Sequence, residues 1–145
     1  ANKKIVGSTD LSDTAEHFLV SFWTCVSKNI VQWNELIKKE ISKVDLRENY
    51  IVTQGVVVQA LGLIGAYFYH NPTLDMNKYL SKLQVIDWKR NASQWKLRVI
   101  RSDGKIITSN KAILLTAIQI KKEIGLRLSE EEQHKEAQFL NSINI

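Results

Sequence analysis

A run of mostly apolar residues from Gly55 to Tyr69 constrains the fold of this chain more than any other segment. Only Gln59 interrupts its apolar character, and the run is shorter than the ~20 residues that a membrane-spanning helix needs. Asn71 and Pro72 end the helix, because proline disfavours helical geometry in the residue before it. This run predicts a helix at the centre of a folded domain, and we expect no membrane partner.

Three glycines lie on this predicted helix. Gly55 and Gly62 are seven residues apart and therefore share a face, which Gly65 continues. A glycine inside a helix costs about 1 kcal/mol relative to alanine. We expect the close approach of another helix to compensate for that cost.

The length and composition favour a single domain. A chain of 145 residues with 44% hydrophobic content can bury a core of its own. We expect a flexible arm over residues 1–9 and a single helical domain over residues 10–145. Cys25 is the only cysteine, which excludes a disulfide framework and suits a reducing compartment such as the cytoplasm. We expect Cys25 to be buried.

Local signals predict where most of the other helices begin and end. Asp10 or Ser12 can cap a first helix that extends to Ile30, and further helices follow. The remaining signals are Ser42 with Asp45 as a helix start, Thr73, Leu74 and Asp75 as the beginning of another helix, Ser109 or Asn110 as a cap, Gly125 as a helix end, and Ser129 with Glu132 as a capping box.

One segment has the period of a β-strand. Trp95, Leu97 and Val99 alternate with polar neighbours, and an Asp103-Gly104 pair follows. Alternation beside an Asp-Gly pair is a strong signal of a β-hairpin. The predicted fold is therefore mostly α: a compact helical domain with one β-hairpin around residues 95–108. Strict alternation places Arg98 on the solvent-facing side, and we expect Arg101 to be exposed as well.

The net positive charge of the chain is confined to residues 84–111. This stretch holds seven Lys or Arg and two Asp, an excess of five that equals the net charge of the whole chain, +5. A localised basic segment is typical of a surface that meets nucleic-acid phosphate, although a solvated basic hairpin has the same composition. The candidate nucleic-acid-binding residues are Lys89, Arg90, Asn91, Lys96, Arg98, Arg101, Lys105 and Lys111.

Two residues just before this segment's first cations have more than one interpretation. Trp88 can anchor the turn to the helices, the interpretation we favour slightly, or stack on a nucleic-acid base. Asp87 can accept a hydrogen bond from Arg90 or cap the turn. We therefore assign Asp87 and Trp88 a structural role, together with the helix glycines.

Catalytic and metal-binding motifs are not apparent. His17, His70 and His134 fall on three different predicted elements without a second ligand at a suitable spacing. No glycine-rich phosphate loop is present, and neither Cys25 nor any serine stands beside an evident base. The sequence therefore predicts no metal and no cofactor, and it favours a role other than catalysis without excluding an enzyme.

Several of these segments resemble the C-terminal part of the DndB family of DNA sulfur modification proteins, which carry a DGQHR domain. The resemblance spans residues 20–132. The segments that carry it, in order, are Gln54–Gly65 (QGVVVQALGLIG), Ile86–Asn91 (IDWKRN), Trp95, Asn110–Thr116 (NKAILLT) and Gly125–Glu131 (GLRLSEE).

The resemblance implies a bacterial, cytoplasmic protein that binds duplex DNA and regulates transcription of genes for DNA phosphorothioation. It also implies a second copy of the chain or other DNA-modification proteins as partners. The Asp-Gly-Gln-His-Arg motif is absent, so we expect the chain to be the C-terminal fragment of a longer protein. Gln54 stands where the family pattern has a histidine, so no histidine role can be transferred to that position.

Two other functions stay open at this point. The chain can be a protein-interaction or oligomerisation module whose DNA contacts are made by a missing N-terminal part. It can contribute to an enzyme only if the missing motif acts together with Asp87 or Arg90. The sequence therefore favours a DNA-binding regulator over both alternatives.

Overall fold

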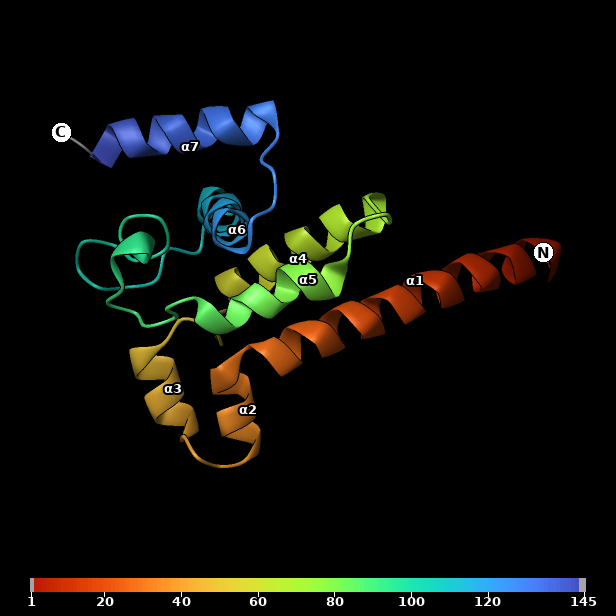
Figure 1. The fold of residues 1–145 in the computed structure, drawn as a ribbon, viewed down its shortest axis with the longest axis horizontal. Helices are drawn as coiled ribbons and strands as arrows, with labels where there is room; N and C mark the ends of the chain where they lie inside the picture. The colour runs from red at the N-terminus through yellow and green to blue at the C-terminus, as the bar shows by residue number, and fades with distance from the viewer. Residues whose placement is uncertain (1, 144–145) are drawn as a thin grey trace.

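Residues 2–143 form seven α-helices and two short 3-10 helices (Figure 1). The structure, a computed structural model, describes the backbone of residues 2–143 and the side chains of residues 13–143. The elements are α1 (Asn2–Asn29), α2 (Val31–Ile37), α3 (Lys43–Asn49), α4 (Gly55–His70), α5 (Met76–Leu80), η1 (Ser81–Val85), η2 (Ser93–Trp95), α6 (Asn110–Ile124) and α7 (Glu130–Ile143).

The apolar helix α4 lies in the middle of the fold, as predicted. It packs against α6 on one side and α1 on the other, and one hydrophobic core joins these helices to α5 and η1. The side chains of Val58, Leu63 and Tyr69 remain exposed, so the helix is covered on most of its surface but not on all of it. None of the helices in the described part of the chain is long and apolar enough to span a membrane.

Only one of the three α4 glycines marks a close approach. A Cβ at Gly65 would lie 2.9 Å from Cε2 of Phe22 on α1, whereas a Cβ at Gly55 or Gly62 would meet nothing within 4 Å. The predicted glycine face is therefore wrong for Gly55 and Gly62. Gly65 alone faces α1, and there the contact is with an aromatic side chain.

The predicted helix signals are confirmed at five places. The Oγ atoms of Ser42 and Ser109 accept from the backbone N–H groups of Asp45 and Ala112. Asp75 caps α5 in the same way, and Gly125 ends α6 in the left-handed conformation with φ of 83°. Ser129 and Glu132 form the reciprocal capping box of α7, with N–H···O distances of 2.9 and 3.1 Å.

The start of the first helix differs from the prediction. Helix α1 begins at Asn2 and includes most of the stretch that was predicted to be a loose arm. Asp10 and Ser12 therefore lie within the helix and do not cap it. The only glycine in this stretch is Gly7, and one glycine lowers helix stability without ending a helix.

The predicted β-hairpin around residues 95–108 is wrong, because residues 2–143 contain no β-strand. The turn at Asp103 and Gly104 exists, with Gly104 at φ of 88°, but only Ile100 and Ile106 pair across it. The alternation fails because Val99 and Ile100 are both buried, while Leu97 is 45% exposed and adopts φ of 63°. The segment from residue 86 to residue 109, hereafter the basic loop, is thus a compact loop that contains η2.

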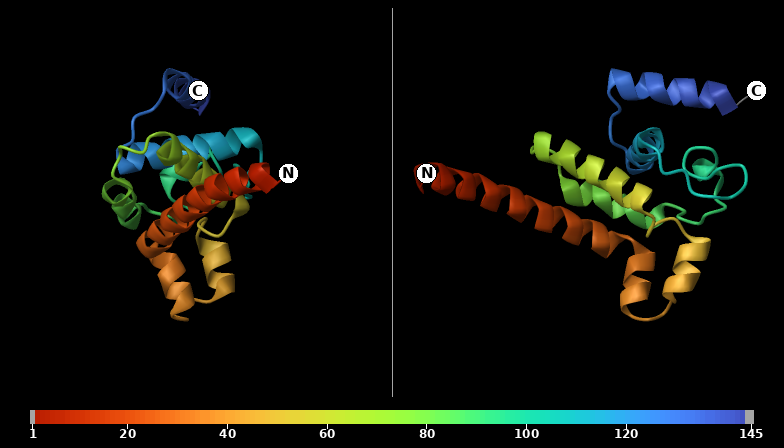
Figure 2. Two further views of the ribbon diagram at one scale, coloured as in Figure 1. Left: turned by 90° about the vertical axis from the view of Figure 1, so that its right-hand side faces the viewer. Right: turned by 180° about the vertical axis from the view of Figure 1, so that it is seen from behind.

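Helix α7 forms an outer layer of the molecule. It lies across α6 and beside the basic loop, on the side opposite α1 (Figures 1 and 2). A small hydrophobic cluster, separate from the main core, joins Phe139 of α7 to Leu115 and Ile118 of α6. The attachment of α7 thus depends on few apolar contacts.

Candidate nucleic-acid interface

A stacked pair of tryptophans holds the basic loop against the helices. The rings of Trp88 and Trp95 are nearly parallel, with centroids 5.5 Å apart, and both side chains are buried. The Nε1 of Trp95 donates to the carbonyl of Asp87 at 2.7 Å, and the Nε1 of Trp88 donates to the carbonyl of Leu83 at 3.3 Å. Trp88 is therefore a core anchor, as favoured from the sequence, and its ring is not available to stack on a base.

Backbone hydrogen bonds join the start of the basic loop to the end of α3. The N–H of Arg90 donates to the carbonyl of Asn49 at 2.8 Å, and the N–H of Ile51 donates to the carbonyl of Trp88 at 3.0 Å. Asp87 caps this turn, because its Oδ1 accepts from the N–H of Lys89 at 3.0 Å. Of the two interpretations of Asp87, turn capping is confirmed.

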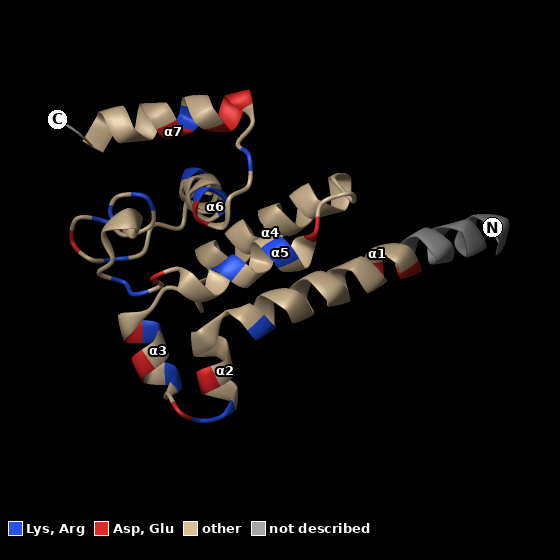
Figure 3. Ribbon diagram, in the orientation of Figure 1, with Lys and Arg blue, Asp and Glu red and all other residues tan. Residues whose placement is uncertain are grey.

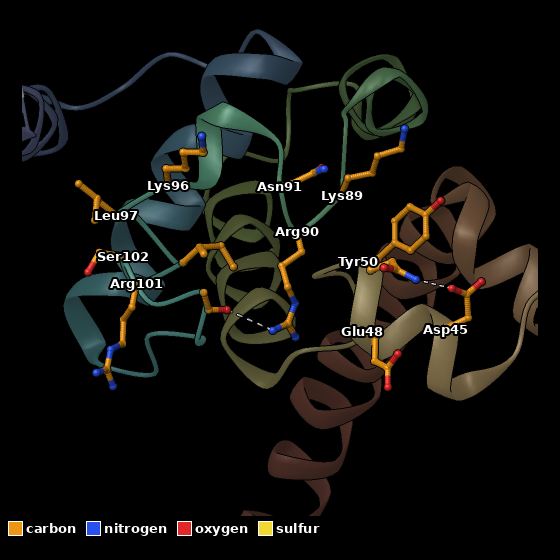
Figure 4. A pocket seen from close by; sticks show the side chains of 13 residues that line it. Asp45, Glu48, Tyr50, Lys89, Arg90, Asn91, Lys96, Leu97, Arg101 and Ser102 are labelled. Atoms are coloured by element: carbon orange, nitrogen blue, oxygen red, sulfur yellow. Dashed lines mark hydrogen bonds between the residues drawn. The ribbon is translucent and has the colours of Figure 1, made fainter.

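A groove of about 880 Å³ lies between the basic loop and α3 (Figure 4). Lys89, Asn91 and Lys96 extend along one of its edges, and Arg101 projects from the loop at a different side. Five of the eight candidate residues from the sequence therefore line one groove. They are Lys89, Arg90, Asn91, Lys96 and Arg101.

Arg90 lies in the middle of the groove and is partly committed to the fold. Its two terminal nitrogens donate to the carbonyls of Arg47, at 3.0 Å, and Gly104, at 3.4 Å. The Nε of Arg90 is buried and has no hydrogen-bond partner. Arg90 thus connects the last turn of α3 to the Asp103-Gly104 turn, and a cation at that end of a helix also interacts favourably with the helix dipole.

Arg98 is not at this groove, and the prediction that it faces solvent is wrong. Its side chain is 3% exposed and forms an ion pair with Glu136 of α7 at 2.7 Å. Its guanidinium also donates to the carbonyls of Leu115, at 2.8 Å, and Gln94, at 3.3 Å. The guanidinium is turned toward two acceptors that are distant in the sequence, the Leu115 carbonyl of α6 and the Glu136 carboxylate of α7.

The other candidate cations are exposed. Arg101 is exposed as predicted, and its guanidinium is 3.0 Å from the carboxylate of Asp103. Lys105 lies beyond the Asp103-Gly104 turn and Lys111 in the first turn of α6, and neither lines the groove. Lys and Arg side chains follow one another along the basic loop and recur on α6 (Figure 3). The structure therefore divides the eight candidates into five in the groove, two exposed outside it and one buried.

A comparison with protein families identifies the family of this chain. Residues 1–127 match the family described as DndB, DNA-sulfur modification-associated. The chain belongs to the DndB family. No curated protein and no solved structure matches the chain.

In this DndB-family chain, the wall of the groove opposite the basic loop was not predicted from the sequence. Asp45 and Glu48 of α3 and Tyr50 just after it line that wall, about forty residues before the cations of the basic loop. No local pattern connects these two segments, because their contact results from tertiary packing. The two carboxylates place negative charge on the α3 wall of the groove, apart from the edge that bears Lys96 (Figure 4).

The described residues also bear on metal and thiol chemistry. Among them, no three His, Cys, Asp or Glu side chains are grouped so that they could hold a metal ion. Cys25 is buried as expected, and its Sγ donates to the Oδ1 of Asn77 at 3.2 Å. Burial raises the pKa of the Cys25 thiol, which lowers the fraction of reactive thiolate.

Proposed function

We propose that the groove beside the basic loop binds the phosphate backbone of duplex DNA, and that the protein acts as a DNA-binding transcriptional regulator associated with DNA sulfur modification. The observation that carries this proposal is the row of Lys89, Asn91 and Lys96 along one edge of the groove (Figure 4). Membership of a family associated with DNA sulfur modification supports DNA as the polyanion. The cytoplasm, where bacterial DNA lies, is the expected compartment.

Physical chemistry supports phosphate contact over base reading at this surface. Lysine is a flexible point charge that meets phosphate without strict geometry, and the stacked Trp88 and Trp95 keep the loop backbone in place. The described helices that flank the groove present no row of side chains suited to the major groove. We therefore expect weak binding with little sequence preference, with a dissociation constant of ~10⁻⁴–10⁻⁶ M at physiological salt.

A salt titration of binding to a short duplex tests this proposal. The logarithm of the binding constant should fall linearly with the logarithm of salt concentration, with a slope of about −0.9 for each phosphate contacted. The triple variant Lys89→Gln/Lys96→Gln/Arg101→Gln should therefore lose two to three units of slope, about 0.9 for each of the three contacts it removes. Its affinity at low salt should fall at the same time.

The matched control is Lys28→Gln/Lys38→Gln/Lys39→Gln, which removes the same charge from exposed positions on α1 and after α2. None of these lysines lines the groove. The control should retain most of the salt slope. Equal losses of slope in both variants would show that the overall charge of the chain, and not the groove, determines binding. Absence of binding by the parent chain at low salt would overturn the proposal.

A protein-interaction module is the alternative from another functional class. Leu19 and Val20 are 52% and 62% exposed on α1, which is unusual for neighbouring large apolar side chains. The variant Leu19→Ser/Val20→Ser should change the oligomeric state in analytical ultracentrifugation if α1 forms contacts between copies of the chain. Under the DNA-binding proposal this variant should leave the salt slope unchanged.

A further inference from the structure

A second cluster of cations, Arg98 of the basic loop with Lys121 and Lys122 of α6, is covered by α7. Arg98 and Lys122 both contact the carboxylate of Glu136, with N···O distances of 2.7 Å each. Lys121 contacts the carboxylate of Glu132 at 2.8 Å. Two carboxylates of one helix therefore pair with three cations, one from the basic loop and two from α6.

The arrangement around Glu136 is one that a phosphate group can also satisfy. Arg98 approaches both carboxylate oxygens, at 2.7 and 2.8 Å, in the two-pronged geometry that guanidinium groups form with carboxylates and phosphates alike. The Nζ of Lys122 donates to Oε2 of Glu136 at 2.7 Å. Arg98 thus donates two parallel hydrogen bonds to one anionic group, and Lys122 donates a third to the same group.

The cover over these cations is lightly attached. Of the side chains on α7, only those of Glu136 and Phe139 are buried. The ring of Phe139 has the guanidinium of Arg98 4.5 Å from its centroid, and it packs on a small cluster apart from the main core. Elements with few buried apolar contacts open at lower free energy than the rest of a domain.

The family match includes the cations of this cluster but not the carboxylates that contact them. Arg98, Lys121 and Lys122 lie within the matched residues 1–127, whereas Glu132 and Glu136 lie beyond them. The carboxylates that form ion pairs with the three cations thus come from the part of the chain that the family match does not include.

We propose that Arg98, Lys121 and Lys122 form a second binding site for nucleic-acid phosphate, and that α7 occupies this site with Glu132 and Glu136 until DNA displaces it. This proposal rests on the proposed DNA-binding function. DNA binds more tightly to the form with α7 displaced, so the apparent affinity at this site is the affinity of that open form multiplied by the fraction of molecules in which α7 is displaced. Helix α7 is therefore a built-in competitor for DNA.

Two pairs of substitutions on the same helix test the proposal. Glu132→Gln/Glu136→Gln removes the two carboxylates that contact the cations, and glutamine still accepts a hydrogen bond from Arg98. Glu130→Gln/Glu131→Gln makes the same change of charge at exposed positions that contact none of the three cations. The first pair should tighten binding to a 20-base-pair duplex about tenfold relative to the second.

The salt slope should be similar for the two pairs. Once DNA has displaced α7, its phosphates contact the same three cations in both variants, so the two slopes should agree to within about one unit. Equal affinities of the two pairs would overturn the proposal while leaving the groove as the DNA site. Loss of DNA binding in every variant, the parent included, would overturn both proposals.

A measurement on the unaltered chain avoids dependence on variants that fold poorly. Amide hydrogen exchange over residues 130–143 should become at least several-fold faster when duplex DNA is added, because DNA displaces α7. The rest of the domain should exchange no faster. Unchanged or slower exchange in α7 on saturation with DNA would contradict displacement even if the groove binds DNA.

Discussion

The guanidinium of Arg98 and the carboxylate of Glu136 meet in the interior of the protein through two hydrogen bonds, 38 residues apart in the sequence. The guanidinium also donates hydrogen bonds to the carbonyls of Gln94 and Leu115, so one side chain joins the basic loop to α6 and α7. The basic loop is thus fixed from two sides, by Arg98 toward α7 and by the Trp88–Trp95 stack toward the core.

Arg98→Met should lower the free energy of unfolding by about 1.5–3 kcal/mol, the range for hydrogen bonds to charged groups, because Leu115 and Gln94 lose a buried donor. Arg101→Met is the control, since Arg101 pairs with Asp103 at the surface. That change should stay within about 0.5 kcal/mol. Urea denaturation monitored by helicity measures both, and similar effects of the two substitutions would contradict a structural role for Arg98.

Trp88→Ala should destabilise the protein by roughly 3–5 kcal/mol, as expected for a large buried aromatic side chain. The stacked partner Trp95 would lose its neighbour, and the start of the basic loop would lose its anchor. Trp88→Phe keeps a ring in the stack and should cost clearly less. A chain with Trp88→Ala that keeps the parent midpoint in chemical denaturation would show that the stack does not hold the loop.

Gly65→Ala should destabilise the protein by about 1–3 kcal/mol, the usual cost of overpacking a core, because its Cβ would lie 2.9 Å from the buried ring of Phe22. Gly62→Ala should instead stabilise α4 by up to about 1 kcal/mol, since a Cβ there meets nothing within 4 Å. Thermal melts of the two variants give opposite shifts if this difference in packing is correct.

Arg90→Gln should lower stability more than it lowers the salt slope of DNA binding, because its guanidinium already donates to the carbonyls of Arg47 and Gly104. Lys89→Gln should do the reverse, since Lys89 is exposed on the groove edge. Paired denaturation and salt titration of both variants check this expectation. A loss of about one slope unit in Arg90→Gln without loss of stability would assign Arg90 to phosphate contact.

The docking of α7 should weaken as the solution is acidified. Burial acts to raise the pKa of Glu136, but the hydrogen bonds and charges of Arg98 and Lys122 outweigh it and hold this pKa below its usual value of 4.5. Lys121 and Ser129 lower the pKa of Glu132 against burial in the same way. A lowered pKa in the folded state gives stability that is present above pH 4.5 and is lost as the pH falls through the folded-state pKa.

Glu123 contributes with the opposite sign, because burial raises its pKa in spite of hydrogen bonds from Gln119 and Gln94. Its protonation on acidification therefore offsets part of the loss. Hydrogen exchange over residues 130–143 from pH 6 down to about pH 3, corrected for the intrinsic pH dependence of exchange, measures the result. The variant Glu132→Gln/Glu136→Gln should lose most of this pH dependence.

Short-range signals in the sequence determined most of the helix boundaries. Ser42, Asp75, Ser109, Gly125 and the Ser129–Glu132 box act within three or four residues of the backbone groups that they satisfy, so their effect does not depend on the rest of the fold. The apolar run in α4 likewise predicted the central helix, because a helix with few polar side chains must be covered. The clustering of cations in one stretch predicted five of the residues around the groove.

Only the tertiary structure decided the conformation of the basic loop and the position of Arg98. Alternation at Trp95, Leu97 and Val99 favoured a strand, but the acceptors for Arg98 come from α6 and α7, and they draw its side chain inward and leave Leu97 exposed. No local pattern predicted that Asp45 and Glu48 of α3 line the groove, because they meet the basic loop only through tertiary packing. A local pattern of alternation holds no information about the partners of Arg98, which lie 17 and 38 residues further along the chain, although a guanidinium buried at this place requires them because an unpaired interior charge is costly.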